Sequence, residues 1–268
     1  MIEHYRIHEV SRYINWIYFF HAWGFQPRDM QSPEATQLLK EAEQMLTLLN
    51  EKFQTHAIFK LAEANSEEND VWIENTRFPF LRQQTAKERK PYLSLSDFIR
   101  PKSQGIKDRI GLFATTVDAE MEQLYQEDHY QHLLVKTLAD RLAEATAEKL
   151  HEAIRKTIWG YAPDEQLTME QLHNEEFQGI RPAVGYPSLP DQSVNFLLDE
   201  ILDMQQIDIQ LTENGMMQPH ASVSGLMFAH PASRYFSIGK IDEEQLQDYA
   251  SRRKLPITLM RKFLAANL

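Results

Sequence analysis

The sequence contains no cysteine, and this absence removes several kinds of site at once. Disulfides, thiolate metal sites, iron–sulfur clusters and cysteine nucleophiles are all excluded. No stretch approaches the ~20 consecutive apolar residues that a membrane-spanning helix requires. The N-terminal MIEHYRIHEV also lacks the basic start and apolar centre of a signal peptide. We therefore expect a cytoplasmic protein that does not enter a membrane.

Positive charge is scarce as well. The chain has 28 Lys and Arg against 39 Asp and Glu, a formal net charge of −11, whereas nucleic-acid binding needs a basic face. The nucleotide-binding, zinc-protease, serine-hydrolase and CxxC motifs are missing too. His129 and His132 form an i, i+3 pair, but such a pair on an acidic helix is usually solvated, so we predict no metal site and no nucleic-acid partner.

The remaining composition is that of a folded protein. Hydrophobic residues make up 43% and aromatic residues 10% of the 268 residues, which is enough for a packed core. Expected strands and helices do not alternate as parallel βαβ units would, so we predict an α+β fold with an antiparallel sheet. We expect one domain over residues 1–268, with an N-terminal helical region of about residues 1–55 packed on the rest.

Local patterns predict the elements of this fold. The expected helices are residues 33–53, 192–204, 242–251 and 256–264. The expected strands are residues 57–64, 71–74, 109–117, 207–211, 222–229 and 235–238. Residues 82–91 are expected to form a polar connection. Residues 118–158 contain no glycine or proline and repeat apolar residues at helical intervals, which predicts one very long helix or two helices with a bend.

The loop GIRPAVGYP, residues 179–187, concentrates two of the 9 glycines with two prolines. Arg181 beside Pro182 places a permanent bidentate cation on a backbone of fixed φ. Gly185 allows close approach of the main chain, and the following proline restrains Tyr186 to extended geometry. Such a loop suits the carboxylate of an amino-acid-like ligand. It also suits a rigid loop whose arginine pairs with a structural carboxylate, and the loop alone favours this second interpretation while leaving both open.

Further segments appear in an order that is typical of one family. The chain resembles the C-terminal activation domain of cobalamin-dependent methionine synthase. The matching segments are residues 13–20, 81–84, 96–101, 138–145, 159–163, 179–187, 211–214, 223–225, 230–236, 247–253 and 264–268. The RxxxGYP motif is weak by itself, but the whole order is specific and covers nearly the entire chain.

The resemblance implies a curved, helix-rich α+β domain around a twisted antiparallel sheet. In the family this domain binds S-adenosylmethionine and caps the cobalamin domain when the cofactor has become cob(II)alamin. A flavodoxin-like partner supplies an electron, and the sulfonium methyl group moves to cobalt. The implied partners are therefore a cobalamin-binding methionine synthase core and a flavodoxin-like electron donor. Cobalamin would enter only through a partner, and the domain alone would have no complete active site.

Family roles can be carried onto matching positions. The implied ligand-binding residues are Arg181, Ala183, Gly185, Glu144, Tyr235 and Asn15, and the implied catalytic residue is Tyr186. Arg181 would hold the ligand's carboxylate, and Glu144 would face its amino end. Tyr235 would pack on or bond the adenosine, and Tyr186 would reach towards the methyl-transfer region. These residue types suit the chemistry of the ligand, because recognition of a zwitterionic nucleoside needs a cation, a carboxylate and an aromatic ring.

Two positions depart from the family pattern. Asn15 stands where the family usually has an acidic residue that helps to hold the ammonium or sulfonium. Gln192 stands where a histidine tends to follow the loop. In a partly desolvated pocket, a lost charge-assisted bond costs about 1–3 kcal/mol, or roughly ten- to a hundredfold in affinity. The sequence therefore predicts weakened S-adenosylmethionine binding.

The sequence also lacks a DxHxxG cobalamin-binding segment and the homocysteine and folate modules. We expect a stand-alone module that acts in trans on a separate cobalamin protein. The alternative is an adaptor or sensor that keeps the fold and partner surface but has weakened or lost ligand binding. Asn15 and Gln192 favour that alternative, so both functions stay open at the level of sequence.

Overall fold

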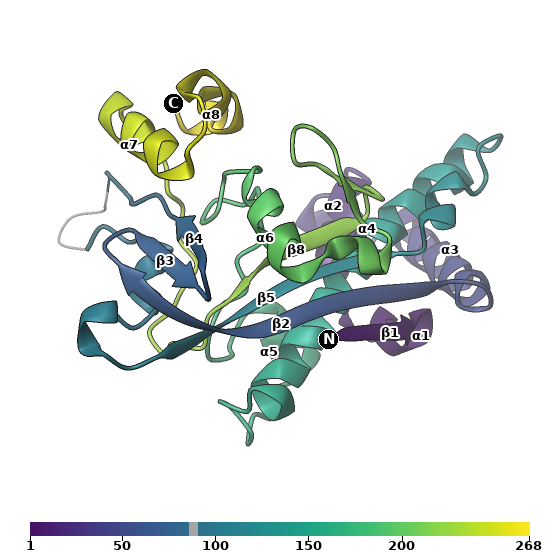
Figure 1. The fold of residues 1–268 in the computed structure, drawn as a ribbon. Coiled ribbons are helices and arrows are strands. Elements are labelled where there is room, and N and C mark those ends of the chain that lie inside the picture. The colour runs from purple at the N-terminus through teal and green to yellow at the C-terminus, as the bar shows by residue number, and fades with distance from the viewer. Residues whose placement is uncertain (86–90) are drawn as a thin grey trace.

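A curved antiparallel sheet forms the centre of the fold in the computed structural model, which describes residues 1–85 and 91–268. Its strands are β1 (Ile2–Arg6), β2 (Gln54–Glu67), β3 (Asp70–Ile73), β4 (Thr76–Pro79), β5 (Asp108–Val117) and β8 (Ser222–Met227). The order is β4-β3-β2-β5-β8, and β1 pairs with the first half of β2. Strand β2 runs across the whole molecule (Figure 1). Every ladder of this sheet is antiparallel, which confirms the predicted α+β class.

Both faces of the sheet are buried. The helices that cover it are α4 (His129–Ala153) and α6 (Val194–Leu202). On one face, Phe59 and Phe113 share a buried cluster with Leu150 of α4. On the other face, Ile58 and Leu112 belong to the cluster that contains the apolar side of α6. Neighbouring residues of each strand thus point to opposite layers, as the period of two requires.

The N-terminal helices α1 (Ile7–Val10), α2 (Trp16–Ala22) and α3 (Pro33–Asn50) gather at one end of the molecule (Figure 1). They share a buried apolar cluster with α4. The predicted start of α3 is confirmed, because the Ser32 hydroxyl accepts a hydrogen bond of 3.1 Å from the Ala35 N–H. Strand β1 was not predicted. It shows that the first 55 residues are not wholly helical, since residues 2–6 join the sheet.

The C-terminal helices α7 (Glu243–Arg253) and α8 (Ile257–Phe263) lie at the opposite end, beyond β4 (Figure 1). They form a separate small cluster around Tyr249 and Met260. The remaining elements are the short helix α5 (Met169–His173) and a two-stranded sheet of β6 (Gln210–Leu211) and β7 (Met217–Gln218). Among the described residues, no helix is both long and apolar enough to cross a membrane.

The long helix predicted over residues 118–158 is divided. A 3-10 turn covers Ala119–Gln123, Tyr125 adopts a left-handed φ of 56°, and α4 begins only at His129. The Asp128 side chain accepts hydrogen bonds from the N–H groups of Tyr130 and Gln131. An acidic N-cap thus starts a new helix inside a stretch that lacks glycine and proline. At its other end, α4 continues into a π-helical turn over Ile154–Ile158.

Two predicted strands are wrong. Residues 235–238 belong to no strand, and residues 207–211 contain only the two-residue strand β6 after a 3-10 turn, Met204–Ile207. Short apolar runs cannot reveal whether a partner strand is available. The predicted strand 57–64 lengthens to Gln54–Glu67, and its turn contracts to the two residues before Asp70. Half of the predicted polar connection, residues 86–90, lies outside the described residues.

Candidate ligand-binding site

Backbone hydrogen bonds hold the loop of residues 179–187 against β8. The Val184 N–H donates to the Ser224 carbonyl at 2.9 Å, and the Leu226 N–H donates to the Pro182 carbonyl at 3.1 Å. Between these bonds, a side chain at Gly225 would place its Cβ only 2.3 Å from the Pro182 oxygen. Glycine at position 225 therefore permits the close approach that fixes the loop.

Helix α4 presents a charged stripe to this loop. Arg141, Glu144 and Glu148 are spaced by three and four residues and so lie on one helical face. All three line the same cavity as Arg181. The stripe and the loop are the two principal walls of the site, although they are far apart in sequence.

The cavity has a volume of about 750 Å³. Of the residues assigned from sequence, it is lined by Asn15, Glu144, Arg181, Ala183, Tyr186 and Tyr235. Gly185 is not among the lining residues, although Ala183 and Tyr186 of the same loop are. It has a φ of +87°, and a Cβ there would lie 2.9 Å from the Gln192 Oε1. Gly185 thus shapes the loop through its backbone conformation and its contact with Gln192.

Arg181 makes contacts through both its side chain and its backbone. Its Nη2 donates to the Glu148 Oε2 at 2.7 Å, and the two side chains are only 15% and 13% exposed. Burial opposes the charge of the guanidinium, but Glu148 and nearby groups outweigh burial and raise the pKa of Arg181. From the loop alone, the partner of Arg181 could be a ligand carboxylate or a structural carboxylate. The structure contains a structural partner, Glu148, and Glu148 itself lines the cavity.

The hydroxyl of Tyr235 accepts a hydrogen bond of 2.9 Å from the Arg181 backbone N–H. Burial is the largest cause that raises the pKa of Tyr235 to about 12, although Arg181 acts in the opposite direction. The phenol is consequently neutral at physiological pH. It links the loop to residues 235–238, the segment that was predicted to be a strand.

Tyr186 stands at the cavity with 52% of its surface exposed. Its hydroxyl donates to the Glu144 Oε1 at 3.0 Å, and the Arg141 Nη1 donates to the Glu144 Oε2 at 2.8 Å. Burial and then the Glu144 charge raise the pKa of Tyr186 to about 12. Both oxygens of Glu144 are thus engaged within the protein.

Asn15 enters the site from α2. Its Oδ1 accepts a hydrogen bond of 3.2 Å from the Ile17 N–H, so the side chain caps this helix while it lines the cavity. Capping explains why a short polar side chain suits position 15, because asparagine and aspartate are comparable N-caps. The capping geometry does not restore the negative charge that the resemblance leads one to expect.

Sequence reasoning missed three charged residues of the cavity: Arg141, Glu148 and Glu175. Glu148 follows Glu144 by four residues, so helical spacing could have identified it. Glu175 has a left-handed φ of 59° and gave no such signal. Desolvation raises the pKa of Glu175, although Arg181 acts against this shift.

The charged residues leave the cavity slightly negative. Two arginines and three glutamates line it, so its formal charge is one negative. Three enclosed atoms of these residues, Arg141 Nε, Glu148 Oε1 and Arg181 Nε, have no hydrogen-bond partner among the described residues. The site therefore combines unused donors, an unused acceptor and aromatic rings, which is the set that a zwitterionic nucleoside requires.

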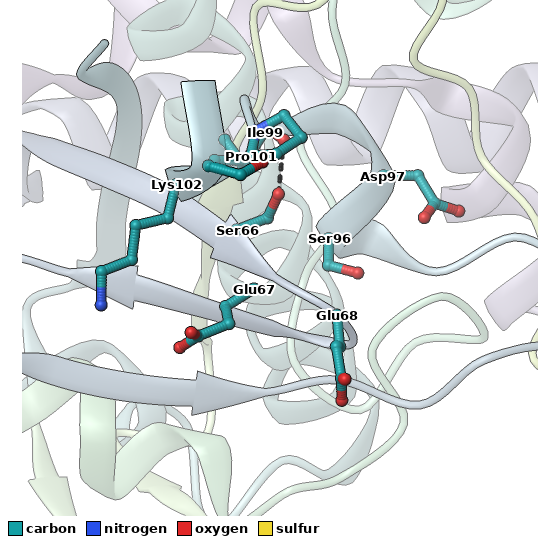
Figure 2. A pocket seen from close by; sticks show the side chains of 9 residues that line it. Ser66, Glu67, Glu68, Ser96, Asp97, Ile99, Pro101 and Lys102 are labelled. Carbon is teal, nitrogen blue, oxygen red and sulfur yellow. Dashed lines mark hydrogen bonds between the residues drawn. The ribbon is translucent and has the colours of Figure 1, made fainter. Parts of the chain in front are cut away.

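A second cavity of about 570 Å³ lies between the end of β2 and residues 96–103. Figure 2 shows that the Ser66 hydroxyl is already bonded to the Ile99 carbonyl, at 2.7 Å. Asp97 is paired with Arg82. None of its lining residues has an enclosed side-chain atom without a partner in the described part of the chain. Across the described residues as a whole there is no group of three or more side chains that could hold a metal ion. Of the histidine pair noted in the sequence, His132 forms a hydrogen bond with the Leu124 carbonyl.

Comparison with known proteins assigns the family. Residues 6–254 match the family model described as vitamin B12 dependent methionine synthase, activation domain. The chain belongs to this family. It is also similar to a crystal structure of the MetH reactivation domain bound to AdoHcy, at 38% identity and a TM-score of 0.94. That match covers 100% of this chain and 90% of the other. The family and the fold expected from the resemblance are both confirmed.

Proposed function

We propose that this chain binds S-adenosylmethionine in the cavity between α4 and the loop of residues 179–187. The observation that carries this proposal is the convergence of Arg181, the α4 carboxylates and Tyr235 on one cavity. S-adenosylmethionine combines a carboxylate with an ammonium and a sulfonium, a net charge of +1, which complements the formal charge of this cavity. The AdoHcy-bound reactivation domain, similar over the full chain, supports the same ligand class.

The proposed orientation follows from the charges. Arg181 holds the ligand's carboxylate, and the backbone at Ala183 lines the bound molecule. Tyr235, beside Phe236 in the lining, offers an aromatic surface for the adenosine. We assign Tyr186, which lines the cavity and is half-exposed, to face both the ligand's sulfonium and a docked partner.

We further propose that the bound ligand serves the reductive remethylation of cobalamin held by a separate methionine synthase core. When bound by that core, cobalamin supplies the metal that accepts the methyl group, and a flavodoxin-like donor supplies the electron. The contribution of this chain is to bind the methyl donor, orient its sulfonium and present it to the partner. Family membership supports this role, and the separate partner is our proposal.

A reconstitution with two separate proteins tests the whole proposal. The chain is mixed with a cob(II)alamin-loaded methionine synthase core, a reductant and S-adenosylmethionine, and the absorbance of methylated cobalamin is followed. We expect methylation that depends on the added chain. The Arg181→Ala variant should abolish it, and a variant that works equally well would show that the proposed site is wrong.

The second candidate function is an adaptor or sensor with weakened ligand binding. The specific observation is that Asn15 uses its side-chain oxygen as a helix cap and brings no charge to the cavity. If this function is correct, the chain binds the core without stimulating methylation in the same reconstitution. Asn15→Asp, which keeps the cap and adds a charge, should then raise ligand affinity.

A further inference from the structure

The Arg181–Glu148 ion pair is incomplete on both sides. Only one oxygen of Glu148 meets the guanidinium, at 2.7 Å from Nη2. The other oxygen, Oε1, and the Arg181 Nε are both enclosed, and neither has a partner among the described residues. Arginine and carboxylate commonly pair through two parallel hydrogen bonds, which would satisfy both of these atoms. The offset pair instead leaves one donor and one acceptor unpaired in two residues that line the cavity.

Unused polar atoms of this kind are unfavourable in a buried setting. An enclosed donor or acceptor without a partner loses its hydration without any compensation. The effect is larger next to a buried charge pair. A ligand that supplies one acceptor to Arg181 Nε and one donor to Glu148 Oε1 removes both deficits together.

An α-amino acid group has this arrangement, because its carboxylate and its ammonium are attached to the same carbon. We propose that Glu148 accepts a hydrogen bond from the ligand's α-ammonium while Arg181 binds its carboxylate. The pair then recognises the free amino-acid end of the ligand. This inference rests on the proposed binding of S-adenosylmethionine, and it adds a specificity residue to that function.

The contacts of Glu144 support this assignment. The resemblance placed Glu144 at the ligand's amino end, yet its two oxygens already accept hydrogen bonds from Tyr186 and Arg141. Glu148, one turn further along α4, retains an unused oxygen beside the arginine. Glu144 therefore has part of its acceptor capacity in use for Tyr186 and Arg141, whereas the Glu148 Oε1 is wholly unused, and we assign the ammonium to Glu148.

A buried histidine lies next to the pair on α4. The next residue of the α4 stripe is His151, which is fully buried. Burial, and then the charges of Arg155 and Arg181, hold the pKa of His151 well below its usual range. His151 is therefore neutral at physiological pH and does not compete with the ligand's ammonium for Glu148.

The test compares two nucleosides on two proteins. S-adenosylhomocysteine carries the amino-acid end, whereas methylthioadenosine lacks it. For Glu148→Gln we expect the affinity for S-adenosylhomocysteine to fall at least about tenfold, the effect of losing one charge-assisted bond. The affinity for methylthioadenosine should stay within about twofold of the wild type, because the substitution touches no part of that ligand. Glu200→Gln, at an exposed position on α6, is the matched control and should change neither value.

Equal binding of S-adenosylhomocysteine by the wild type and Glu148→Gln would overturn the inference and leave the proposed function intact. Failure of the wild type to bind either nucleoside would instead overturn both. If Glu148→Gln does not fold, a crystal structure of the wild type with S-adenosylhomocysteine decides the matter. We expect a Glu148 oxygen within hydrogen-bonding distance of the amino nitrogen, and an amino group bound elsewhere would refute the assignment.

Discussion

Replacement of Arg155 by methionine should destabilise the protein strongly, because this arginine is part of a buried ion pair. Its side chain is 0% exposed and that of its partner Glu165 is 7% exposed. Two parallel hydrogen bonds join them, at 2.8 Å from Nε and 2.7 Å from Nη2. The guanidinium also lies 4.1 Å from the centre of the Phe177 ring. Arg155→Met keeps most of the apolar stem and removes only the charge and its bonds.

The expected loss follows from the group that is left behind. Removal of one member of a buried pair costs about 3–5 kcal/mol, because the other charge stays buried without compensation. The double variant Arg155→Met/Glu165→Gln leaves no such charge, so it should be more stable than the single variant. The exposed pair Arg261–Glu243, with side chains about half exposed, provides the control. Arg261→Met should cost no more than about 1 kcal/mol.

Denaturant unfolding monitored by tryptophan fluorescence measures these differences. The midpoint should fall markedly for Arg155→Met, recover in part for the double variant, and change little for Arg261→Met, with similar slopes throughout. An Arg155→Met protein within 1 kcal/mol of the wild type would refute the reasoning. A double variant less stable than the single one would refute it equally.

Three further predictions concern the cavity and its loop. Gly185→Ala should lower stability by about 1–2 kcal/mol, because φ is +87° and the new Cβ meets the Gln192 Oε1 at 2.9 Å; an unchanged melting temperature would contradict this. Affinity for S-adenosylmethionine should increase as pH rises through the raised pKa of Glu175, because the ionised carboxylate attracts the cation. Calorimetry in two buffers of different ionisation enthalpy should then detect proton release, and a flat profile through the acidic range would exclude it. The pKa of Tyr235 is about 12 against an ordinary 10.0, so the native state retains this proton longer than the unfolded state. The free energy of unfolding should therefore decrease as pH rises from 10 towards 12. The decrease should be less steep in Tyr235→Phe, which has no phenol to titrate.

Much of the fold was predictable because its signals are local. Ser32 and Pro33 mark the start of α3, and the apolar run before Val117 marks β5. The break before α4 was not predictable from breaker residues, because the helix starts at the side chain of Asp128 in a stretch without glycine or proline. The segment at Tyr235 has the composition of a strand, but among the described residues it forms no strand ladder.

The site was predictable where a motif places residues together. The loop motif identified Arg181 and Tyr186, and both line the cavity. Helical spacing from Glu144 could have placed Glu148 on the same face of α4, but its pairing with Arg181 follows only from tertiary structure. Glu175 has no motif at all, since a left-handed residue after a short helix gives little sequence signal.

Isothermal titration of the wild-type chain with S-adenosylmethionine tests the central claim most directly. We predict saturable binding of one ligand per chain, with a matching increase in melting temperature and with loss of both effects in Arg181→Ala. The absence of heat and of any thermal shift at millimolar ligand would contradict the claim that this cavity binds S-adenosylmethionine.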